Sequence, residues 1–325
     1  VLLCTLHGSR RAFNVRMRGY EAGLRVRRVI RVIVDEFSQV SPPLWFACLQ
    51  RAKYSEVRPT AFALLGDPYQ LPIVTTQPEL QENIGEFIRR VSGGDVHQLR
   101  IQYRMHEDIC EAVNSLRDAL NCPYKLETGS IVRDRNLTHP NLGFEWDERR
   151  CPPEFREILD PSNPFVIVDT SELGEEQPCF GGSWRNIDEA ELAVRILAAF
   201  HRSYLRSGRE LNPSDIKILS PYSGQVGYIQ YLLHTYGFDR EFCTTIYRSQ
   251  GREYPCVIIS FVRNNPANFI GFLAEPKLRA QVYVGCSRAQ GKLIVLLSRR
   301  CFEGHRDFDY LYRTRSAYHV RVRGR

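Results

Sequence analysis

Acidic and amide side chains follow two apolar segments in the first quarter of the chain. Asp35 and Glu36 come directly after the apolar run 29–34, and Gln70 follows a second run, 61–65. A carboxylate at the end of a buried strand can hold Mg²⁺ through its water shell, and its neighbour can polarise an attacking water. A glutamine in this place can orient water or sense a terminal phosphate. Taken singly, the Asp-Glu pattern is weak and also typical of a solvated strand end, and the segment before Gln70 is better explained by a Gly-Asp-Pro turn.

Two arginines later in the chain lie just before a predicted helix or strand. Arg104 lies in IQYRMH, directly before a predicted helix, where its guanidinium can be aimed at a phosphate. Arg288 lies in VGCSRAQGKLIVLLS, just before an apolar run. Two further polar segments, SPYSGQ at 220–225 and TTIYRSQGREYPCVIISF at 244–261, also adjoin apolar runs. Residues suited to phosphate chemistry therefore collect beside the predicted strands.

The elements that position these residues alternate along the chain. Apolar, β-branched runs predict strands at 1–5, 29–34, 61–65, 165–169, 216–220, 256–261 and 293–297. Apolar residues at helical spacing predict helices at 105–120, 187–200 and 224–233. Alternating strands and helices predict an α/β fold with mostly parallel sheets, in which ligands gather at the carboxyl ends of the strands.

Composition narrows the class of protein. The chain has 325 residues, of which 43% are hydrophobic, enough for one large domain or two ordinary ones. The net charge of +7 is compatible with a phosphate-backbone partner but is weak support alone. The ten cysteines contain no C-x-x-C pair, so we interpret them as free thiols in the core of a protein from a reducing compartment. No apolar run of about 20 residues is present, which predicts that the chain has no membrane span. No signal peptide is present, which predicts a protein of the nucleus or cytoplasm that is not secreted.

Polar breaks suggest the domain boundaries. The glycine-bearing stretch 91–95 predicts a boundary between a first domain at 1–94 and a second at 95–315, followed by a basic tail at 316–325. The charged, proline-containing region 128–163 reads as a long connection or surface insertion. The arginine-rich end from 312 is predicted to be solvated and disordered, with a basic arm that touches nucleic acid as the alternative.

Five of the quoted segments form an ordered series. DEFSQ, GDPYQLP, QYRMH, SQGREYPCVIISFVR and GCSRA, in this order and spacing, resemble the motor motifs of superfamily 1 helicases of the up-frameshift type. That group includes the nonsense-mediated-decay helicase, senataxin and the Okazaki-fragment nuclease-helicase. The resemblance extends from the first residue to about residue 299 and implies a P-loop NTPase fold with two RecA-like lobes. The first lobe is expected to be incomplete, and the second to be the AAA-type C-terminal domain.

The resemblance implies a catalytic role for each matching residue. Asp35 would bind Mg²⁺ and Glu36 would activate water, while Gln70 would contact the γ-phosphate of ATP. Arg104 and Arg288 would be arginine fingers that reach the phosphates from the second lobe. Fingers of this kind stabilise the charge that develops during phosphoryl transfer.

Binding roles are implied for the remaining matching residues. Tyr103 would pack against adenine, Glu253 would hold the ribose, and Gln250 and Gly251 would position their loop near nucleotide and strand. Contacts with the backbone of single-stranded RNA or DNA would come from four residues: Thr5, Ser220, Pro221 and Tyr222. The cofactors implied are ATP and Mg²⁺.

The sequence also departs from the family pattern. No G-x-x-x-x-G-K-[ST] phosphate loop occurs in the 325 residues, and the family places it upstream of VLLCT. Truncation is the simpler expectation and true loss the second. Phe37 stands where the family usually has a small residue.

Two functions remain open at this point. The first is an ATP-dependent DNA or RNA helicase or translocase, of which this chain would be a C-terminal motor portion. The alternative is a catalytically inactive, helicase-derived nucleic-acid-binding or scaffold protein. An unrelated α/β hydrolase or transferase is poorly supported, because neither G-x-S-x-G nor a strand followed by G-x-G-x-x-G is present.

Overall fold

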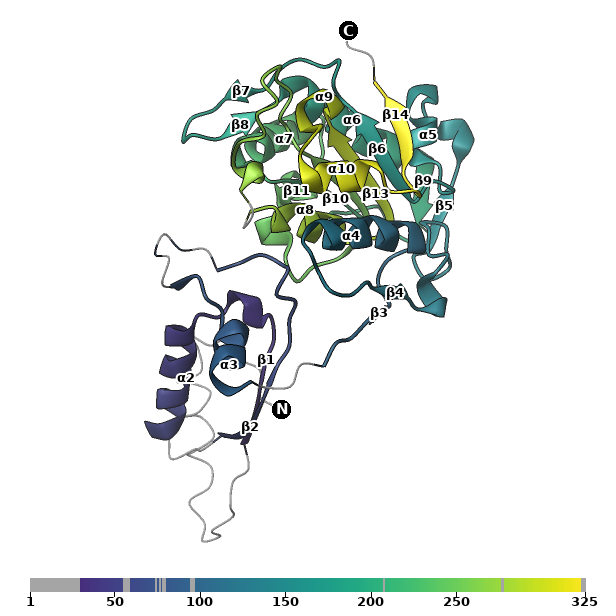
Figure 1. Cartoon of the computed structure of the whole chain (residues 1–325). Coiled ribbons are helices and arrows are strands. Elements are labelled where there is room, and N and C mark those ends of the chain that lie inside the picture. Colours follow the sequence, from purple (N-terminus) through teal and green to yellow (C-terminus); the bar gives the residue numbers. More distant parts are fainter. Residues whose placement is uncertain are drawn as a thin grey trace. The chain divides into compact units, whose positions relative to one another are not determined.

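The computed structural model describes residues 30–54, 59–73, 75, 77, 80–93, 97–206, 208–275 and 278–322 (Figure 1). The chain divides into unit 1, Val1–His97, and unit 2, Gln98–Arg325. The predicted strand at 1–5 and the candidate Thr5 lie outside the described residues. Among the described residues, no helix combines the length and apolar character that a membrane span needs.

Unit 1 is built on two parallel strands, β1 (Ile30–Val34) and β2 (Pro59–Leu64). Its helices are α2 (Pro42–Tyr54) and α3 (Ile84–Ser92), and a small core gathers Val34, Val40, Trp45 and Ile84. A capping box begins α3, because Asn83 accepts from the backbone N–H of Glu86 and the Glu86 carboxylate accepts from that of Asn83. The two strands predicted for this part of the chain are confirmed.

Unit 2 contains a six-stranded, all-parallel sheet with the order β11-β10-β12-β13-β6-β14. Its strands in chain order are β6 (Phe165–Asp169), β10 (Ile216–Ser220), β11 (Cys243–Thr245), β12 (Tyr254–Ser260), β13 (Ala289–Leu297) and β14 (Tyr318–Arg321). Every residue of β6, β10 and β12 is buried, which explains why these strands appear in the sequence as unbroken apolar runs. The predicted α/β fold with a mostly parallel sheet is confirmed.

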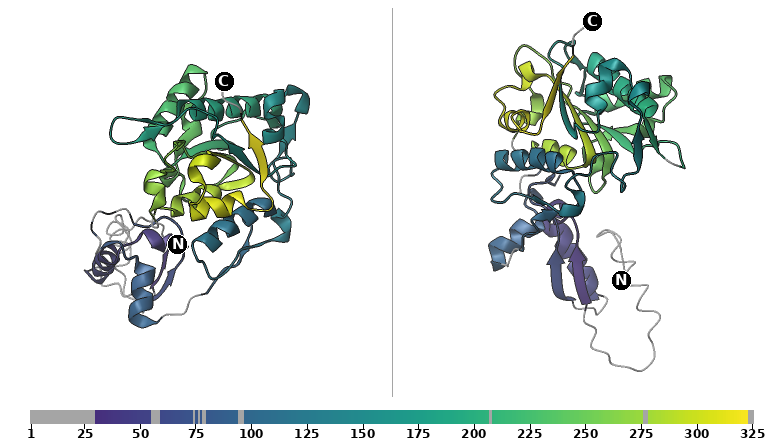
Figure 2. Two further views of the ribbon diagram at one scale, coloured as in Figure 1. Left: turned by 45° about the horizontal axis from the view of Figure 1, so that its top comes forward. Right: turned by 90° about the vertical axis from the view of Figure 1, so that its right-hand side faces the viewer.

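Helices cover both faces of this sheet (Figures 1 and 2). One face packs against α6 (Ile187–Ser203) and α7 (Ser223–Thr235), and this layer forms the main core of the unit. The other face packs against α4 (Glu107–Ala119), α8 (Ala280–Cys286) and α10 (Arg306–Tyr312). The three helices predicted from apolar periodicity correspond to α4, α6 and α7.

Shorter elements join these layers. Strand β3 (Ile101–Gln102) pairs with β4 (Glu127–Thr128), β5 (Phe144–Trp146) with β9 (Tyr204–Arg206), and β7 (Gln177–Pro178) with β8 (Trp184–Arg185). Helices α5 (Arg156–Leu159) and α9 (Arg299–Phe302) are single turns. Turns of 3-10 helix occur at Phe37–Gln39, Ser130–Val132, Glu148–Arg150, Pro153–Phe155, Arg240–Phe242, Tyr247–Ser249 and Gly271–Ala274.

The irregular region 128–163 is more than a surface insertion, because part of it is buried. Leu137, Leu142, Phe144 and Phe155 belong to the main core of unit 2. Of the nine described cysteines, all are free thiols and all but Cys179 are buried, as the sequence led us to expect.

The arginine-rich end departs from its prediction. Residues Tyr318–Arg321 form β14, which pairs in parallel with β6 at one edge of the sheet, so the predicted disordered end is wrong for this segment. Val320 packs against the core, and Arg321 lies 3.8 Å from the carboxylate of Asp169. An edge strand can keep its charged side chains in water, which is why its composition resembles that of a solvated tail.

Candidate functional site

The acidic pair of unit 1 lies at the carboxyl end of β1. Asp35 is exposed, and its carboxylate accepts a 3.0 Å hydrogen bond from the backbone N–H of Glu36. Glu36 adopts a left-handed backbone conformation with φ 54, which turns the chain sharply after the strand. Across the described residues, no group of three or more His, Cys, Asp or Glu side chains could hold a metal ion. A single carboxylate suits Mg²⁺, which usually keeps several waters and shares the rest of its shell with substrate phosphates.

The loop that carries Gln70 adjoins this acidic pair. The backbone N–H of Leu65 donates to Val34 O at 2.7 Å, and that of Phe37 donates to Leu65 O at 3.1 Å. These bonds place the carboxyl ends of β1 and β2 beside each other. Within the described part of the chain, the buried Oε1 atom of Gln70 accepts no hydrogen bond. A buried amide oxygen without a donor is suited to a water or a ligand.

Phe37 is accommodated by two glycines. A Cβ atom on Gly85 would lie 2.2 Å from the Phe37 ring, and one on Gly66 would lie 2.9 Å from it. The ring therefore fills a slot that only glycine at these positions leaves open. This explains how a large side chain is tolerated directly after the acidic pair.

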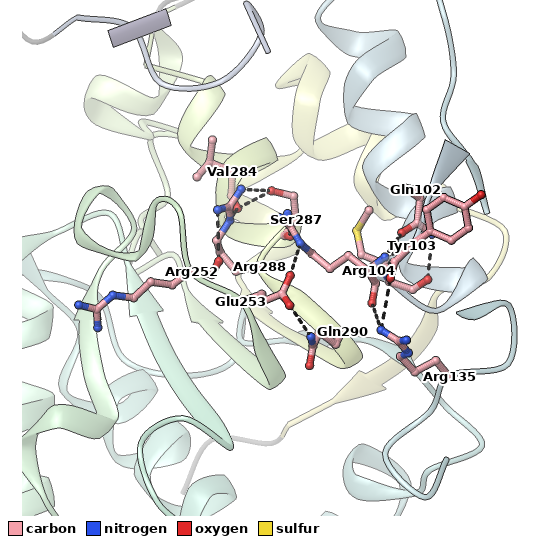
Figure 3. A network of polar contacts seen from close by, with 11 residues as sticks. Gln102, Tyr103, Arg104, Arg135, Arg252, Glu253, Val284, Ser287, Arg288 and Gln290 are labelled. Atoms are coloured by element: carbon pink, nitrogen blue, oxygen red, sulfur yellow. Dashed lines mark hydrogen bonds and ion pairs between the residues drawn. The ribbon is translucent and has the colours of Figure 1, made fainter. Parts of the chain in front are cut away.

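In unit 2, Arg104 and Glu253 form the centre of a polar network (Figure 3). Arg104 Nε donates to Glu253 Oε2 at 2.6 Å, and its Nη1 donates to the carbonyl oxygen of Ser287 at 3.2 Å. The Gln102 side chain accepts from the backbone N–H groups of Arg104 and Met105, both at 2.8 Å. The Arg104 and Glu253 side chains are 38% and 47% exposed, so a ligand can reach both.

Gln290 and Arg135, like Gln102 and Ser287, were not among the predicted site residues. Gln290 Nε2 donates to Glu253 Oε1 at 2.9 Å, so both carboxylate oxygens of Glu253 are held. Arg135 Nη1 lies 3.4 Å from Tyr103 O and 3.3 Å from Arg104 O, which it can bridge as a donor. Gln290 lies two residues after Arg288 in a recognised motif, but nothing in the sequence marks Arg135.

Arg288 is buried within unit 2. Its side chain is 2% exposed, and its Nε and Nη1 atoms donate to the carbonyl oxygens of Val284 and Arg252 at 3.0 and 3.2 Å. Its Nη2 atom donates to Ser287 Oγ at 2.9 Å. The predicted contact between Arg288 and a phosphate therefore requires a different side-chain conformation or a movement of this loop.

Tyr103 presents an exposed ring. Its side chain is 57% exposed and lies against Gly129, where a Cβ atom would approach the ring to 2.4 Å. The loop of Gln250 and Gly251 follows a 3-10 turn, and Gly251 has the left-handed φ of 73. Glu253 directly precedes β12, as Arg288 precedes β13. Glu253 and Arg288 therefore lie at the amino ends of strands, whereas Tyr103 follows β3, as Asp35 follows β1.

The predicted nucleic-acid segment of unit 2 lies at the carboxyl end of β10. Ser220 is fully buried, and its hydroxyl accepts from the backbone N–H of Tyr222 at 3.3 Å. The Tyr222 hydroxyl donates to Ile270 O at 3.1 Å, and burial raises the pKa of this hydroxyl. In this conformation, contact with a nucleic acid can come from Pro221, which is partly exposed, and from backbone atoms, but not from the Ser220 and Tyr222 side chains.

Comparisons with known proteins agree with this architecture. Residues 84–300 match the family described as AAA domain. The chain is similar to the DNA replication ATP-dependent helicase/nuclease DNA2 of Mus musculus, with 29% identity over 81% of this chain and 24% of that protein. It is 30% identical to the Xenopus laevis protein of the same name, over 83% of this chain and 25% of that protein. It is also 29% identical to the human 3'-5' exoribonuclease HELZ2, over 85% of this chain and 9% of that protein. The chain thus spans about a quarter or less of the length of these relatives.

Proposed function

Because this chain belongs to the AAA domain family, in the helicase region of superfamily 1 proteins, we propose that it is a C-terminal motor portion of an ATP-dependent DNA or RNA helicase or translocase. The observation that carries this proposal is the ion pair between Arg104 and Glu253, with the exposed Tyr103 ring on the residue next to Arg104. An aromatic face, a carboxylate and a guanidinium match the three parts of a nucleotide: base, ribose and phosphates.

Glu253 and Arg104 keep hydrogen-bonding capacity for a nucleotide. Glu253 accepts one hydrogen bond at each carboxylate oxygen from protein donors, so each oxygen retains a lone pair for a ribose hydroxyl. Arg104 has further N–H groups beyond those bound to Glu253 and Ser287. Tyr103 would then stack on the adenine, while Gln250 and Gly251 would shape the loop beside it.

Residues of unit 1 would bind the Mg²⁺ ion and the water that act on the phosphates. Asp35 would hold Mg²⁺, an ion that neutralises charge on the transferring phosphoryl group. Glu36 would polarise the attacking water. The amide oxygen of Gln70, which accepts no hydrogen bond within the described residues, would orient that water. Arg104 and Arg288 would stabilise the charge that develops on the phosphate oxygens. The residues present supply only part of a phosphate site, because the sequence has no G-x-x-x-x-G-K-[ST] loop.

The partner in this proposal is single-stranded RNA or DNA in the nucleus or cytoplasm. Binding would be largely independent of sequence, through backbone contacts at Pro221 and the neighbouring backbone, with Thr5 as a further contact. The net charge of +7 supports a phosphate-backbone partner.

A second candidate, a catalytically inactive nucleic-acid-binding or scaffold protein, is favoured by two observations. The sequence lacks the phosphate loop, and the Arg288 guanidinium is bound to acceptors within its own unit. ATP turnover distinguishes the two candidates, whereas nucleic-acid binding does not.

The test is ATP turnover by the protein at its native length, with and without single-stranded oligonucleotides. We expect stimulated turnover, and a loss of about 10³-fold or more in Arg104→Ala, since phosphate-contacting arginines contribute on this scale. Arg195→Ala is the matched control, because Arg195 also pairs with a carboxylate, Glu154, at 3.2 Å on the surface of unit 2. Absence of turnover in the unsubstituted protein would refute the helicase proposal and leave the binding protein.

A further inference from the structure

Strands β7 and β8 form a hairpin (Figure 1), and the loop between them contains Phe180. The backbone N–H of Cys179 donates to Ser183 O at 2.7 Å and closes the loop. Gly181 and Gly182 both have positive φ, 81 and 76, which lets the chain reverse tightly. Phe180 is as exposed as in an extended peptide. The constrained turn therefore holds this apolar ring in water, where a planar ligand can stack on it.

The hairpin is fixed to the first turn of α7. The backbone N–H of Gly224 donates to Ser183 Oγ at 2.9 Å. A Cβ atom on Gly224 would lie 2.9 Å from Cys179 Sγ and 3.0 Å from Trp184 O, so the two backbones are in close contact. The hairpin therefore adjoins the segment Ser220 to Tyr222, which directly precedes α7.

A stack of planar groups extends from the hairpin along α7. The Arg185 guanidinium lies 5.1 Å from the centroid of the Tyr228 ring, and the Tyr228 and Tyr231 rings are 6.1 Å apart with an interplanar angle of 24°. Tyr231 is 61% exposed. Within the described part of the chain, the Arg185 side chain makes no ion pair and no hydrogen bond, and its Nε atom is buried without a partner. A nearby acid, Asp188, already accepts from the backbone N–H of Gly174 at 2.8 Å.

We propose that Phe180, Arg185, Tyr228 and Tyr231 form a platform on which bases of a single-stranded nucleic acid stack. This inference rests on the proposed function, because it extends the nucleic-acid path from Pro221 onto the hairpin and α7. Aromatic faces bind any base, and a guanidinium without a carboxylate partner can take a phosphate of the same strand. The pre-stacked Arg185 and Tyr228 lose little side-chain freedom when a base is added.

The test measures binding of fluorescent single-stranded DNA and RNA 20-mers by the 325-residue chain. We expect Phe180→Ala and Tyr231→Ala each to weaken binding about tenfold, a typical effect of removing one base stack. Arg185→Gln should lower the slope of log affinity against log salt by about one. Tyr310→Ala is the matched control, since Tyr310 is also an exposed helical tyrosine, on α10, beside a cation, Arg306.

A second variant separates stacking from simple apolar contact. Phe180→Trp should bind as the unsubstituted chain does, and its added fluorescence should be quenched by the oligonucleotide, whereas Phe180→Leu should resemble Phe180→Ala. If the chain binds both oligonucleotides and all platform variants bind equally well, the platform is refuted while the proposed function stands. If the unsubstituted chain binds neither oligonucleotide, the nucleic-acid partner of the proposed function fails, and the platform fails with it.

Discussion

Glu189 makes the stability of unit 2 depend on pH. It lies in the first turn of α6 and is fully buried. Its carboxylate accepts from Ser260 Oγ at 2.7 Å, from the backbone N–H of Val262 at 2.8 Å and from Thr170 Oγ1 at 3.1 Å. Burial outweighs these hydrogen bonds and raises the pKa of Glu189 from 4.5 to about 7. The folded state therefore favours the protonated carboxyl.

The size and sign of the effect follow from linkage. The difference between 4.5 and about 7, at 1.36 kcal/mol for each pH unit, corresponds to about 3 kcal/mol in the free energy of unfolding. Because the folded pKa lies above the unfolded one, this stability is fully present below about pH 4.5 and is lost as the pH rises through about 7. Above that pH, the folded protein contains a buried carboxylate.

Glu189→Gln tests this reasoning. The amide has the shape of the carboxyl group, can still accept from Ser260 and Val262, and does not ionise. We expect the variant to match the unsubstituted chain near pH 5 and to exceed its stability at pH 8 by up to about 3 kcal/mol. Denaturant titration followed by far-UV circular dichroism from pH 5 to 8 measures this, with Glu191→Gln on the same helix as control. If Glu189→Gln shows the same pH dependence as the unsubstituted chain, burial does not perturb this carboxyl and the reasoning is wrong.

Two further predictions concern the buried amine of Lys292 and the close contact between Gly85 and Phe37. Lys292 is fully buried, donates to Asp160 O and Asn163 O at 2.8 and 2.7 Å, and burial lowers the pKa of its amine from 10.5 to about 7. Because the folded pKa lies below the unfolded one, the free energy of unfolding of the unsubstituted chain should rise as the pH rises from about 7 to 10.5. Lys292→Met should lack this rise in denaturant titrations at about pH 7.5 to 9.5. An equal rise in the variant would contradict the lowered pKa of Lys292. Gly85→Ala should destabilise unit 1 by about 1–3 kcal/mol, because its Cβ would lie 2.2 Å from the Phe37 ring. Phe37→Ser should remove most of that penalty in the double variant, and purely additive effects on the unfolding midpoint would show that the two positions do not interact.

Strands buried on both faces could be predicted from the sequence, and edge and hairpin strands could not. The β6 and β10 bounds agree with the predicted runs because no residue of either strand faces water. In contrast, three of the four residues of β14 are exposed. Two of the four, His319 and Arg321, have polar or charged side chains of the kind that is typical of a solvated tail. Its formation depends on the free edge of β6, which is a tertiary feature absent from the local sequence.

The candidate site, too, could be predicted only in part from the sequence. Motif order identified Arg104 and Glu253, and the structure places them in direct contact. The motifs could not indicate that Arg288 is buried against Val284 O, because that contact depends on the direction of the side chain. Nor could they indicate that Arg135 donates to the loop of Tyr103, because these two segments are far apart in sequence. The motifs therefore indicated candidate residues but not the conformations of their side chains.

The two proposals for unit 2 concern opposite ends of the strands of one sheet. Glu253 lies at the amino end of β12, whereas Ser220 lies at the carboxyl end of β10, and β10 and β12 are parallel neighbours. The seven residues of β12 span on the order of 20 Å, and every one of them is buried. A strand so fully packed cannot deform gradually, so a change at Arg104 and Glu253 would reach the hairpin as a movement of the whole unit rather than as a local shift. Variants on the stacking platform should accordingly change oligonucleotide affinity while leaving nucleotide affinity without oligonucleotide unchanged, and a platform variant that alters both would contradict this separation.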